Sequence, residues 1–477
     1  MPQKIAIIGA GLGGLTTAYE LSKLGPDGDK LTVDIYEATD RIGGKLHTVA
    51  FEAGPTDMGA EAFMARRTDA VEFFTELGLK DSLVEPSGLR SLVWVDGEAR
   101  QLPTGGIMGI PSSSESVAHL VSDEAARLID GESDRPGFIW PQDGDLNVGA
   151  LVRERYGDDV VDNVVSALLG GVYSCTADDL GVRATIPQLA AEFDRLAAES
   201  PDRTVHLSAA VRNLEEQQAA RRKELPTGHG AVFNAFRDGY QELYEELAEK
   251  SGADIYIDAF ISGIERVESP EAGTGFRLKG GENTVYDHVV LAVPAPTAAL
   301  LLKQIAPDAS RTLSTVKLAN SVVVGMRFAT DEGLPENSGV LVATGADDVQ
   351  AKAFTFSSRK WPHLAERGGA LVRASFGRYG DDIAIRADED DLVDWALDDL
   401  QTITGFDGRE AGLEEIYVQR WFGGLPRFGE THVATVADVE KQLADVDGVS
   451  VTGAWVGGVG VPAVIAHARQ VARSLSS

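Results

Sequence analysis

The sequence is poor in the residues from which disulfides and metal centres are built. Only one of its 477 residues, Cys175, is a cysteine, so an internal disulfide and a cysteine-rich metal site are excluded. None of the eight histidines stands at ligand spacing from a carboxylate or a cysteine, and we therefore predict no metal site. A single cysteine is also typical of a reducing compartment, which indicates a cytoplasmic protein.

Long apolar runs and positive charge are scarce as well. No apolar run reaches the ~18 residues that a membrane span needs, so no transmembrane segment is expected. The longest candidate, 289–302, contains Pro294 and Pro296 and is predicted to be a buried strand followed by a turn. With 43 basic against 74 acidic residues, the net charge is −31, which argues against binding to nucleic acid. An anionic substrate would therefore need a local basic cluster.

Glycine, by contrast, is abundant, and three glycines shape the N-terminus. Gly9, Gly11 and Gly14 follow the apolar run 5–8 in G-x-G-x-x-G spacing and open a segment of helical periodicity. Gly9 permits a tight turn, Gly11 lets a pyrophosphate approach, and Gly14 lets the helix pack on the strand. A second strand ends at Glu37, whose carboxylate suits ribose hydroxyls. Together these features predict a dinucleotide site at the helix N-terminus.

A second glycine turn with flanking basic residues, Arg41, Gly43, Gly44 and Lys45, follows the ribose carboxylate. Such a turn suits a loop that lies along a diphosphate. With it the N-terminus resembles that of the flavin monoamine oxidase superfamily, whose pattern is G-x-G-x-x-G, then Glu, then R-x-G-G-[RK]. The resemblance implies a bound FAD.

Four later segments resemble the FAD-dependent protoporphyrinogen and coproporphyrinogen oxidases within that superfamily. They are G-G-V-Y-S-C-T at 170–176, S-S-R-K-W-P at 357–362, R-W-F-G-G-L-P at 420–426 and the glycine-rich segment from 453. The resemblance covers nearly the whole chain and is greatest to the coproporphyrinogen III oxidases of Gram-positive bacteria. Cys175 stands where that family usually has glycine.

The fold class that this resemblance implies is α/β. We expect a Rossmann-like FAD-binding domain, an α+β substrate domain and an inserted helical domain, in the architecture of p-hydroxybenzoate hydroxylase and monoamine oxidase. The predicted segments are 1–90, 226–300 and 413–477 for the FAD-binding domain, 91–111 and 301–412 for the substrate domain, and 112–225 for the helical domain.

Local patterns refine three of these segments. Asp96-Gly97 predicts a hairpin within 91–102. Apolar residues at helical spacing predict a helix over 232–250. Four short apolar runs between 254 and 293 predict a β-meander.

The resemblance also assigns residues to the cofactor and the substrate. The implied FAD contacts are Gly9, Gly11, Leu12, Gly13, Gly14, Glu37, Ala38, Arg41, Gly44, Lys45, Gly59, Ala60, Glu61, Ala62, Ile261, Trp421, Gly453, Val459, Gly460 and Val461. Arg66 and Arg67 are candidates for substrate carboxylates, although a solvated helix face would explain them as well. Tyr173 could line the substrate pocket or be a packed core tyrosine. For Arg183 a structural ion pair is favoured over a propionate contact.

No catalytic side chain is assigned, because the implied reaction needs none. A methylene bridge of a porphyrinogen gives hydride to the flavin, and dioxygen reoxidises the flavin with release of hydrogen peroxide. The implied partners are thus a porphyrinogen and dioxygen, with a transient contact to a ferrochelatase and a monomeric or homodimeric state. Protoporphyrinogen IX oxidation, amine oxidation, carotenoid desaturation and a non-catalytic FAD-binding scaffold stay open as alternatives.

Overall fold

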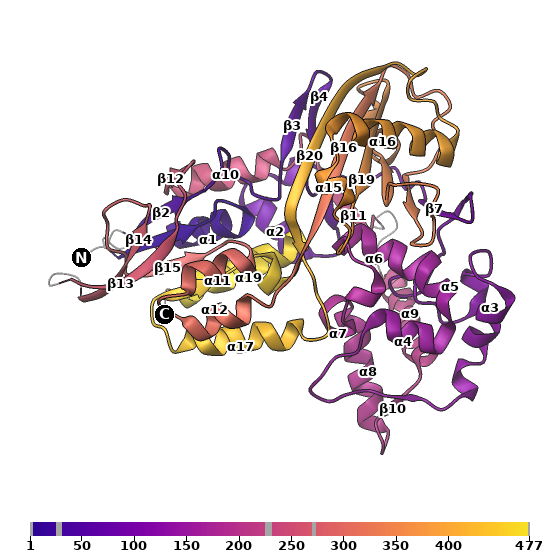
Figure 1. Ribbon diagram of the computed structural model, residues 1–477, viewed down its shortest axis with the longest axis horizontal. Coiled ribbons are helices and arrows are strands. Elements are labelled where there is room, and N and C mark those ends of the chain that lie inside the picture. Colours follow the sequence, from indigo (N-terminus) through magenta and orange to yellow (C-terminus); the bar gives the residue numbers. More distant parts are fainter. Residues whose placement is uncertain (1–2, 25–30, 225–230, 270–272, 476–477) are drawn as a thin grey trace. The chain divides into compact units, whose positions relative to one another are not determined.

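The chain passes back and forth between two structural units (Figure 1). The computed structural model describes residues 3–24, 31–224, 231–269 and 273–475. Unit 1 comprises Met1–Glu85, Val232–Lys317 and Thr435–Ser477, and unit 2 comprises Pro86–Ala231 and Leu318–Ala434. Each unit is built around one large sheet.

Unit 1 contains a five-stranded sheet with the strand order β12-β2-β1-β15-β21, in which every neighbouring pair is parallel. Successive residues of β1 point to opposite faces. Ile5 and Ile7 pack in a cluster with residues of α1, α10 and α19, whereas Ala6 and Ile8 pack in a cluster with residues of α11 and α12. The sheet is therefore buried on both faces, which explains why β1 reads as a continuous apolar run.

The elements of unit 1 have the following bounds: β1 (Lys4–Ile8), α1 (Leu12–Ser22), β2 (Thr32–Tyr36), β3 (Thr48–Phe51), β4 (Gly54–Asp57), β5 (Phe63–Met64), α2 (Thr68–Glu76), β6 (Leu83–Val84), β11 (Phe233–Phe236), α10 (Gln241–Ser251), β12 (Asp254–Tyr256), β13 (Gly263–Ser269), β14 (Gly273–Lys279), β15 (His288–Leu291), α11 (Ala295–Leu302), α12 (Pro307–Leu313), β21 (Val449–Val451), α18 (Ala454–Gly457) and α19 (Val461–Ser474). Helix α17 (His432–Ala444) crosses the boundary between the units.

Three local predictions in this unit are wrong. The segment 254–293 is no meander, because β12 and β15 pair in parallel with β2 and β1, and only β13 and β14 form an antiparallel hairpin. The helix predicted over 232–250 begins only at Gln241, since residues 233–236 form β11 between β5 and β6. Beyond Pro294 the chain forms α11, where a turn was expected. Proline is tolerated in the first turn of a helix, so Pro296 does not end it.

Unit 2 contains a seven-stranded sheet with the strand order β20-β16-β19-β18-β17-β7-β8. Helix α16 packs against one face through residues such as Leu397 and Leu400, opposite Phe328 and Phe356. The hairpin predicted around Asp96-Gly97 is confirmed: β7 and β8 pair on either side of these two residues, whose φ angles are 53° and 73°. Positive φ at both positions is what a two-residue hairpin turn requires.

The sheet elements of unit 2 and their flanking helices have the following bounds: β7 (Leu92–Val95), β8 (Glu98–Gln101), β16 (Leu318–Phe328), β17 (Gly339–Val342), β18 (Ala353–Phe356), α13 (Ser357–Lys360), α14 (Pro362–Ala365), β19 (Ala370–Phe376), α15 (Ile383–Arg386), α16 (Glu389–Thr404) and β20 (Leu413–Pro426). The larger elements of its helical part are α3 (Asp123–Asp130), α4 (Val148–Tyr156), α5 (Asp158–Val160), the π-helical turn η4 (Val161–Val165), α6 (Ser166–Tyr173), α7 (Val182–Thr185), α8 (Pro187–Glu199) and α9 (Leu207–Glu224).

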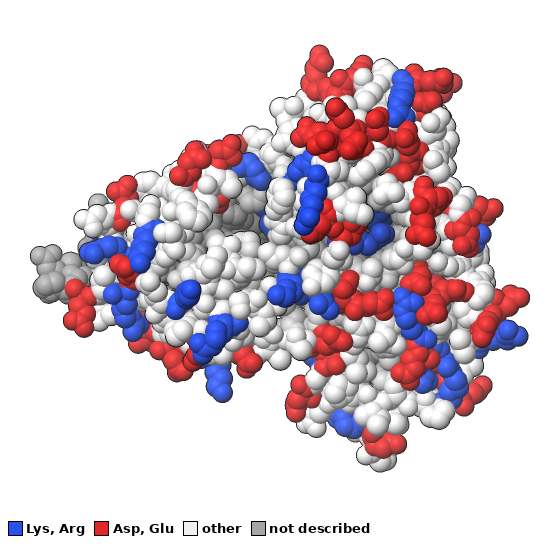
Figure 2. All heavy atoms as spheres, in the orientation of Figure 1, with Lys and Arg blue, Asp and Glu red and all other residues white. Residues whose placement is uncertain are grey.

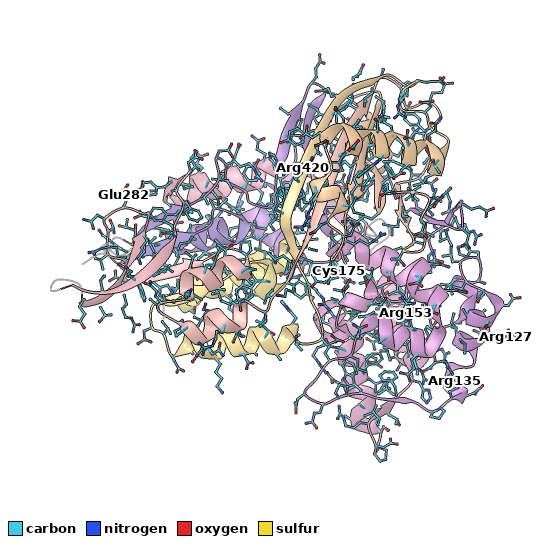
Figure 3. All side chains as sticks on the ribbon, viewed as in Figure 1. Arg127, Arg135, Arg153, Cys175, Glu282 and Arg420 are labelled. Atoms are coloured by element: carbon cyan, nitrogen blue, oxygen red, sulfur yellow. The ribbon has the colours of Figure 1, made fainter. Side chains whose placement is uncertain are left out.

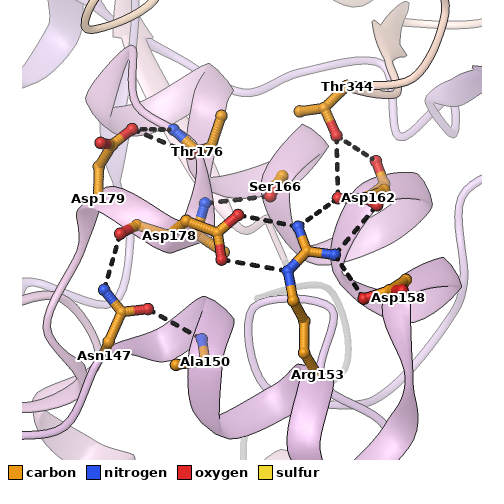
Figure 4. Close-up of polar contacts among 11 residues, drawn as sticks. Asn147, Ala150, Arg153, Asp158, Asp162, Ser166, Thr176, Asp178, Asp179 and Thr344 are labelled. Atoms are coloured by element: carbon orange, nitrogen blue, oxygen red, sulfur yellow. Dashed lines mark hydrogen bonds and ion pairs between the residues drawn. The ribbon is translucent and has the colours of Figure 1, made fainter.

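Ion pairs connect the helices of this part. The guanidinium of Arg153 on α4 lies 2.9 Å from Asp158, 2.6 Å from Asp162 and 2.8 Å from Asp178 (Figure 4). Asp162 also accepts a hydrogen bond from Thr344 beyond β17, which ties the helices to the sheet. One arginine therefore joins α4, α5, η4 and the turn at Asp178.

The acidic excess is visible on the surface. Figure 2 shows acidic side chains gathered over the region that carries α16, whose first turn contains Glu389, Asp390 and Asp391. Acidic residues in a first turn are favourable because the helix N-terminus carries partial positive charge. Within the described ranges, no helix combines the length and the apolar character that spanning a bilayer requires.

Strand β20 lies in the sheet of unit 2, where it pairs with β16 along most of its length. Residues 413–426, assigned from the sequence to the FAD-binding domain, are thus part of the other unit, and residues 301–317 lie in unit 1. The finer division into three domains stays a prediction.

Candidate functional site

The first glycine turn has the geometry that its spacing predicts. Gly9 has a φ of 104°, and a Cβ atom there would come within 2.6 Å of the Ala292 carbonyl oxygen. A Cβ atom on Gly14 would overlap the carbonyl oxygen of Gly9. Both positions therefore require glycine, the first for the turn and the second for the close approach of α1 to β1.

The N-terminus of α1 lacks a cap from the protein. Its N-cap residue, Gly11, has no side chain to accept hydrogen bonds, and the first turn contains no acidic residue. The first helical bond runs from the Leu15 N–H to the Gly11 carbonyl, so the N–H groups before Leu15 precede the helical ladder. Such a helix end favours an anionic group through its free donors and its dipole.

The second glycine turn lies directly beside the first. The Gly43 N–H donates to the Ala10 carbonyl at 2.9 Å, and a Cβ on Gly44 would lie 2.9 Å from the Gly11 Cα. Arg41 stabilises this turn, because its guanidinium donates to the carbonyls of Ile42, Gly44 and Leu46 at 3.1, 2.7 and 3.0 Å.

Lys45 follows this turn. More than a third of its surface is accessible. The surrounding protein desolvates the ammonium group and lowers the pKa of Lys45 to about 8. An anion bound nearby would favour the charged form.

Glu37 lies at the end of β2, where the nucleotide hypothesis requires it. One of its carboxylate oxygens accepts from the Ala10 N–H at 2.9 Å, and the other accepts from the N–H and the hydroxyl of Thr39 at 2.9 and 2.8 Å. An ionised carboxylate has about four acceptor positions, so it can accept a further hydrogen bond from a ribose hydroxyl.

The final glycine segment meets the first one. A Cβ on Gly13 would lie 3.4 Å from the Thr452 side chain and 3.6 Å from the Gly453 backbone. Gly460 is the N-cap of α19 and, like Gly11, provides no side-chain cap; Pro462 occupies the first turn. Two uncapped helix N-termini thus belong to one cluster of glycine turns, formed by residues more than 400 positions apart.

The remaining predicted cofactor residues of unit 1 lie around this cluster. Gly59 packs so closely on the Lys45 carbonyl that a Cβ would overlap it. Ala60, Glu61 and Ala62 are partly exposed. The Ile261 side chain is buried in the core, so only its backbone is left to contact FAD, and this contact stays a prediction.

Trp421 belongs to unit 2, where it lies on β20 opposite Ser321 of β16. Its neighbour Arg420, labelled in Figure 3, donates to the carbonyls of Ala384, Ile385 and Ala387 at the end of α15. Arg420 therefore has a structural role, and a contact between Trp421 and the flavin stays a prediction.

The candidate substrate residues differ in the hydrogen bonds and ion pairs that they already form within the protein. The Arg67 guanidinium forms two hydrogen bonds with Asp69, at 2.9 and 2.7 Å, whereas Arg66 is exposed. The Tyr173 hydroxyl donates to the Thr185 carbonyl at 3.1 Å. Arg183 pairs with Asp194 at 2.7 Å, which confirms the structural ion pair. Arg66, Arg67 and Tyr173 stay predictions as substrate contacts, and Arg67 has its carboxylate-binding edge already occupied.

Sequence reasoning missed His467 of α19. Its Nδ1 lies 3.1 Å from the hydroxyl of Thr452, and its Cβ lies 2.7 Å from the place of a Cβ on Gly457. Burial lowers the pKa of His467, which favours the neutral imidazole. The only sign in the sequence of this contact between His467 and Thr452 was a histidine about one and a half turns into the helix that follows the glycine segment.

These features fit FAD. The open cradle beside Gly11, the uncapped N-terminus of α1 and the carboxylate of Glu37 match a diphosphate flanked by a ribose. No Cβ contact within 4 Å would arise at Gly453, so space remains beside the final glycine segment. The uncapped α19 suits the electron-rich edge of an isoalloxazine ring.

Comparison with known proteins supports this assignment. "Coproporphyrinogen III oxidase" of Mycobacterium tuberculosis (strain ATCC 25618 / H37Rv) is 37% identical over 476 residues, with 99% of this chain and 97% of the relative covered. The protein of the same name from Bacillus subtilis (strain 168) is 27% identical, with 96% and 94% covered.

Solved structures agree with the fold. A crystal structure from Exiguobacterium sp. 255-15, described as a protoporphyrinogen oxidase, has a TM-score of 0.83 at 25% identity and covers 100% of this chain and 99% of its own. Cyclohexylamine oxidase from Brevibacterium oxydans IH-35A, at 18% identity, shares the fold with a TM-score of 0.68 and full coverage of both chains. These structures confirm the α/β fold class predicted from the sequence, and the match to a family of flavin containing enzymes confirms the flavin cofactor. The family model of the flavin containing amine oxidoreductases matches residues 12–476, and the chain belongs to that family.

Proposed function

We propose that this protein is an FAD- and oxygen-dependent coproporphyrinogen III oxidase, which converts coproporphyrinogen III to coproporphyrin III with release of hydrogen peroxide. The observation that carries this proposal is its 37% identity, along essentially the whole chain, to a relative of that name. The cluster of glycine turns in unit 1 supports it independently, because its donors and its space suit FAD.

The residues of unit 1 act on the cofactor by binding and orienting it. The free N–H groups of α1 bind the diphosphate, Glu37 binds the ribose, and Arg41 keeps the second glycine turn in place. When bound, FAD supplies the redox chemistry by accepting electron pairs from the substrate and passing them to dioxygen. The N-terminus of α19 stabilises the negative charge that reduction brings to the ring.

Besides the residues that bind FAD, the protein needs no catalytic acid, base or nucleophile, because the ring nitrogens of the porphyrinogen lose their protons to water. Its main catalytic contribution is the orientation of a methylene bridge toward the flavin. A tetracarboxylate substrate also has to be held by cations in a protein of net charge −31.

A parallel fluorescence assay tests the proposal. The purified protein should carry a flavin absorbance spectrum, and in air it should convert coproporphyrinogen III to a fluorescent porphyrin faster than it converts protoporphyrinogen IX. Peroxide should accumulate in proportion to the porphyrin. A reversed rate ratio would assign the protein to protoporphyrinogen IX oxidation instead.

Three other outcomes would reject the proposal. Flavin that is reduced anaerobically by amines but not by porphyrinogens would indicate an amine oxidase. Flavin that stays oxidised with every porphyrinogen would indicate a scaffold that holds FAD without catalysis. Colourless protein that cannot be reconstituted with FAD would also contradict it.

We further propose a cytoplasmic location, a monomeric or homodimeric state and a transient contact with a ferrochelatase. Cys175 as the sole cysteine supports the location, because a reducing compartment leaves thiols free. Gel filtration and co-sedimentation with a ferrochelatase would test the other two.

A further inference from the structure

Two cationic side chains of unit 2, Lys352 and Arg378, lie near the end of α6 without a carboxylate partner. Neither forms an ion pair within 4.0 Å with any residue in the described part of the chain. Arg153 and Arg183 of this unit are paired, with three aspartates and with one, whereas Arg420 donates to backbone carbonyls. With 74 acidic residues for 43 basic ones, two neighbouring unpaired cations need an explanation.

Lys352 is buried, with 4% of its surface exposed, in the chain just before β18. Its ammonium group donates to the Ser174 hydroxyl at 2.6 Å and to the Gly377 carbonyl at 2.7 Å. Both acceptors are neutral. Burial and the charge of Arg378 lower the pKa of Lys352 to about 7, which is what a buried lysine without a counterion undergoes.

Arg378 follows β19 and is partly exposed. Its Nη2 donates to the Val342 carbonyl at 3.0 Å, while its Nε is buried without an acceptor and lies near Gly170 of α6. Its Nη1 donates to no acceptor among the described residues. The charge of Asp381 acts on Arg378, but the Asp381 carboxylate accepts from the Ile383 N–H and forms no ion pair with Arg378.

The surrounding dipoles do not balance this charge. Helix α6 ends at Tyr173, with Ser174 as its left-handed C-cap, so its C-terminus offers about half a negative charge. Cys175, labelled in Figure 3, is fully buried, and burial raises its pKa to about 12, so it stays neutral. The described residues thus give Arg378 no carboxylate in direct contact, and its unused donors can accommodate one.

We propose that Arg378 binds a carboxylate of the substrate, and that Lys352, behind it, strengthens this site without touching the ligand. The inference rests on the proposed function and names the anchor for one propionate of the tetracarboxylate. It fits the site better than Arg67 does, because Asp69 already occupies the Arg67 guanidinium. Arg378 is then a specificity-determining residue, and Lys352 is a positioning residue.

Equilibrium binding of coproporphyrin III, measured by fluorescence quenching with the FAD-loaded protein, tests this proposal. R378Q should raise the Kd about 10- to 100-fold, since hydrogen bonds to charged groups contribute that much. R378K should lie between R378Q and the wild type. The tetramethyl ester of coproporphyrin, which lacks carboxylates, should bind wild type and R378Q equally.

The matched control is R386Q, which removes an equal charge from an exposed arginine of the same unit that pairs with Asp382. R386Q should leave the Kd unchanged. K352M should raise the Kd for coproporphyrin III and leave that for the ester unaltered, and kcat should change less than KM in all three variants of the pair.

The outcomes separate the two proposals. Unchanged coproporphyrin III binding by R378Q, or an equal loss for the ester, overturns the anchor while the oxidase assay still stands. A wild type that neither binds nor oxidises a porphyrin rejects the proposed function and this inference together. Circular dichroism and flavin content of each variant show whether a loss of porphyrin binding comes from misfolding. If R378Q misfolds, the binding of coproporphyrin III by R378K and the comparison with the ester decide whether Arg378 is the anchor.

Discussion

At the scale of single residues, Lys45 combines a lowered pKa with a place beside the proposed diphosphate site. Its pKa of about 8 lies below the unfolded value near 10.4. Between these values the unfolded chain binds more protons, so this residue makes the cofactor-free protein more stable as pH rises from 8 to about 10.4. That stabilisation is lost below pH 8. Diphosphate binding needs the charged form and has the opposite pH dependence.

We therefore expect the Kd for ADP, which carries the phosphates of the cofactor, to rise about fivefold from pH 8 to pH 9, because Lys45 loses its charge. K45R stays charged throughout this range and should give a flat profile. Isothermal titration calorimetry at several pH values measures both. Equal slopes for the wild type and K45R would show that another group titrates.

Glu132 offers a second test at this scale. It is fully buried between α3 and α4, pairs with Arg155 at 2.6 Å and accepts from the Ser208 hydroxyl at 2.6 Å. Burial alone would raise its pKa, but the hydrogen bonds from Ser208 and Arg155 outweigh burial and lower it. Glu132 thus contributes stability that is present above its unfolded pKa and is lost as pH falls through the folded one.

E132Q should destabilise unit 2 by about 3–5 kcal/mol, because it leaves the buried Arg155 charge unpaired. Urea unfolding followed by circular dichroism measures the change in the free energy of unfolding. The control E199Q removes an exposed helical ion pair with Arg195 and should cost about 0.5 kcal/mol or less. Similar losses in the free energy of unfolding for E132Q and E199Q would contradict the conclusion that burial makes the Glu132–Arg155 pair important for stability.

At the scale of elements, the β1–turn–α1 unit depends on two glycines for different reasons. Gly9 needs its positive φ, whereas Gly14 needs the absence of a Cβ, because the helix packs on the Gly9 carbonyl. These two different roles were predictable from the sequence, since the turn and the start of its helix are formed by residues close together in the chain.

G14A should therefore weaken FAD retention and lower stability by about 1–3 kcal/mol, as overpacking does. G345A is the matched control, because a Cβ there meets nothing within 4 Å and no positive φ is involved. Flavin absorbance per protein after gel filtration, together with thermal unfolding, measures both effects. Full flavin content in G14A would mean that α1 can shift without losing the site.

Elements whose character depends on distant partners were predicted less well. The segment 233–236 has the same apolar spacing as the helix that follows, yet it pairs with β5 and β6. Short apolar runs such as 254–256 and 288–291 do not show whether the strand that pairs with them is the next one in the sequence or a distant one. In this chain β12 and β15 join β2 and β1, so a parallel sheet forms where a meander was expected.

At the scale of the whole molecule, the net charge of −31 opposes the approach of a tetracarboxylate. Salt screens this repulsion over a Debye length of about 10 Å at 0.1 M. The association rate of coproporphyrin III should therefore rise between low and moderate ionic strength, as stopped-flow quenching would measure. The neutral tetramethyl ester should associate at a constant rate. A falling rate for the tetracarboxylate would indicate that the local cations dominate the field at long range.

The amino-acid sequence by itself determined the first dinucleotide unit, the hairpin at Asp96-Gly97 and the position of Glu37, because these follow from residues close together in the chain. Only the tertiary structure decided that Gly13 meets Gly453, and that Lys352 and Arg378 lie together near Ser174 without a carboxylate. Which charges are neutralised depends on side chains brought together across hundreds of residues, and no local pattern records such distances.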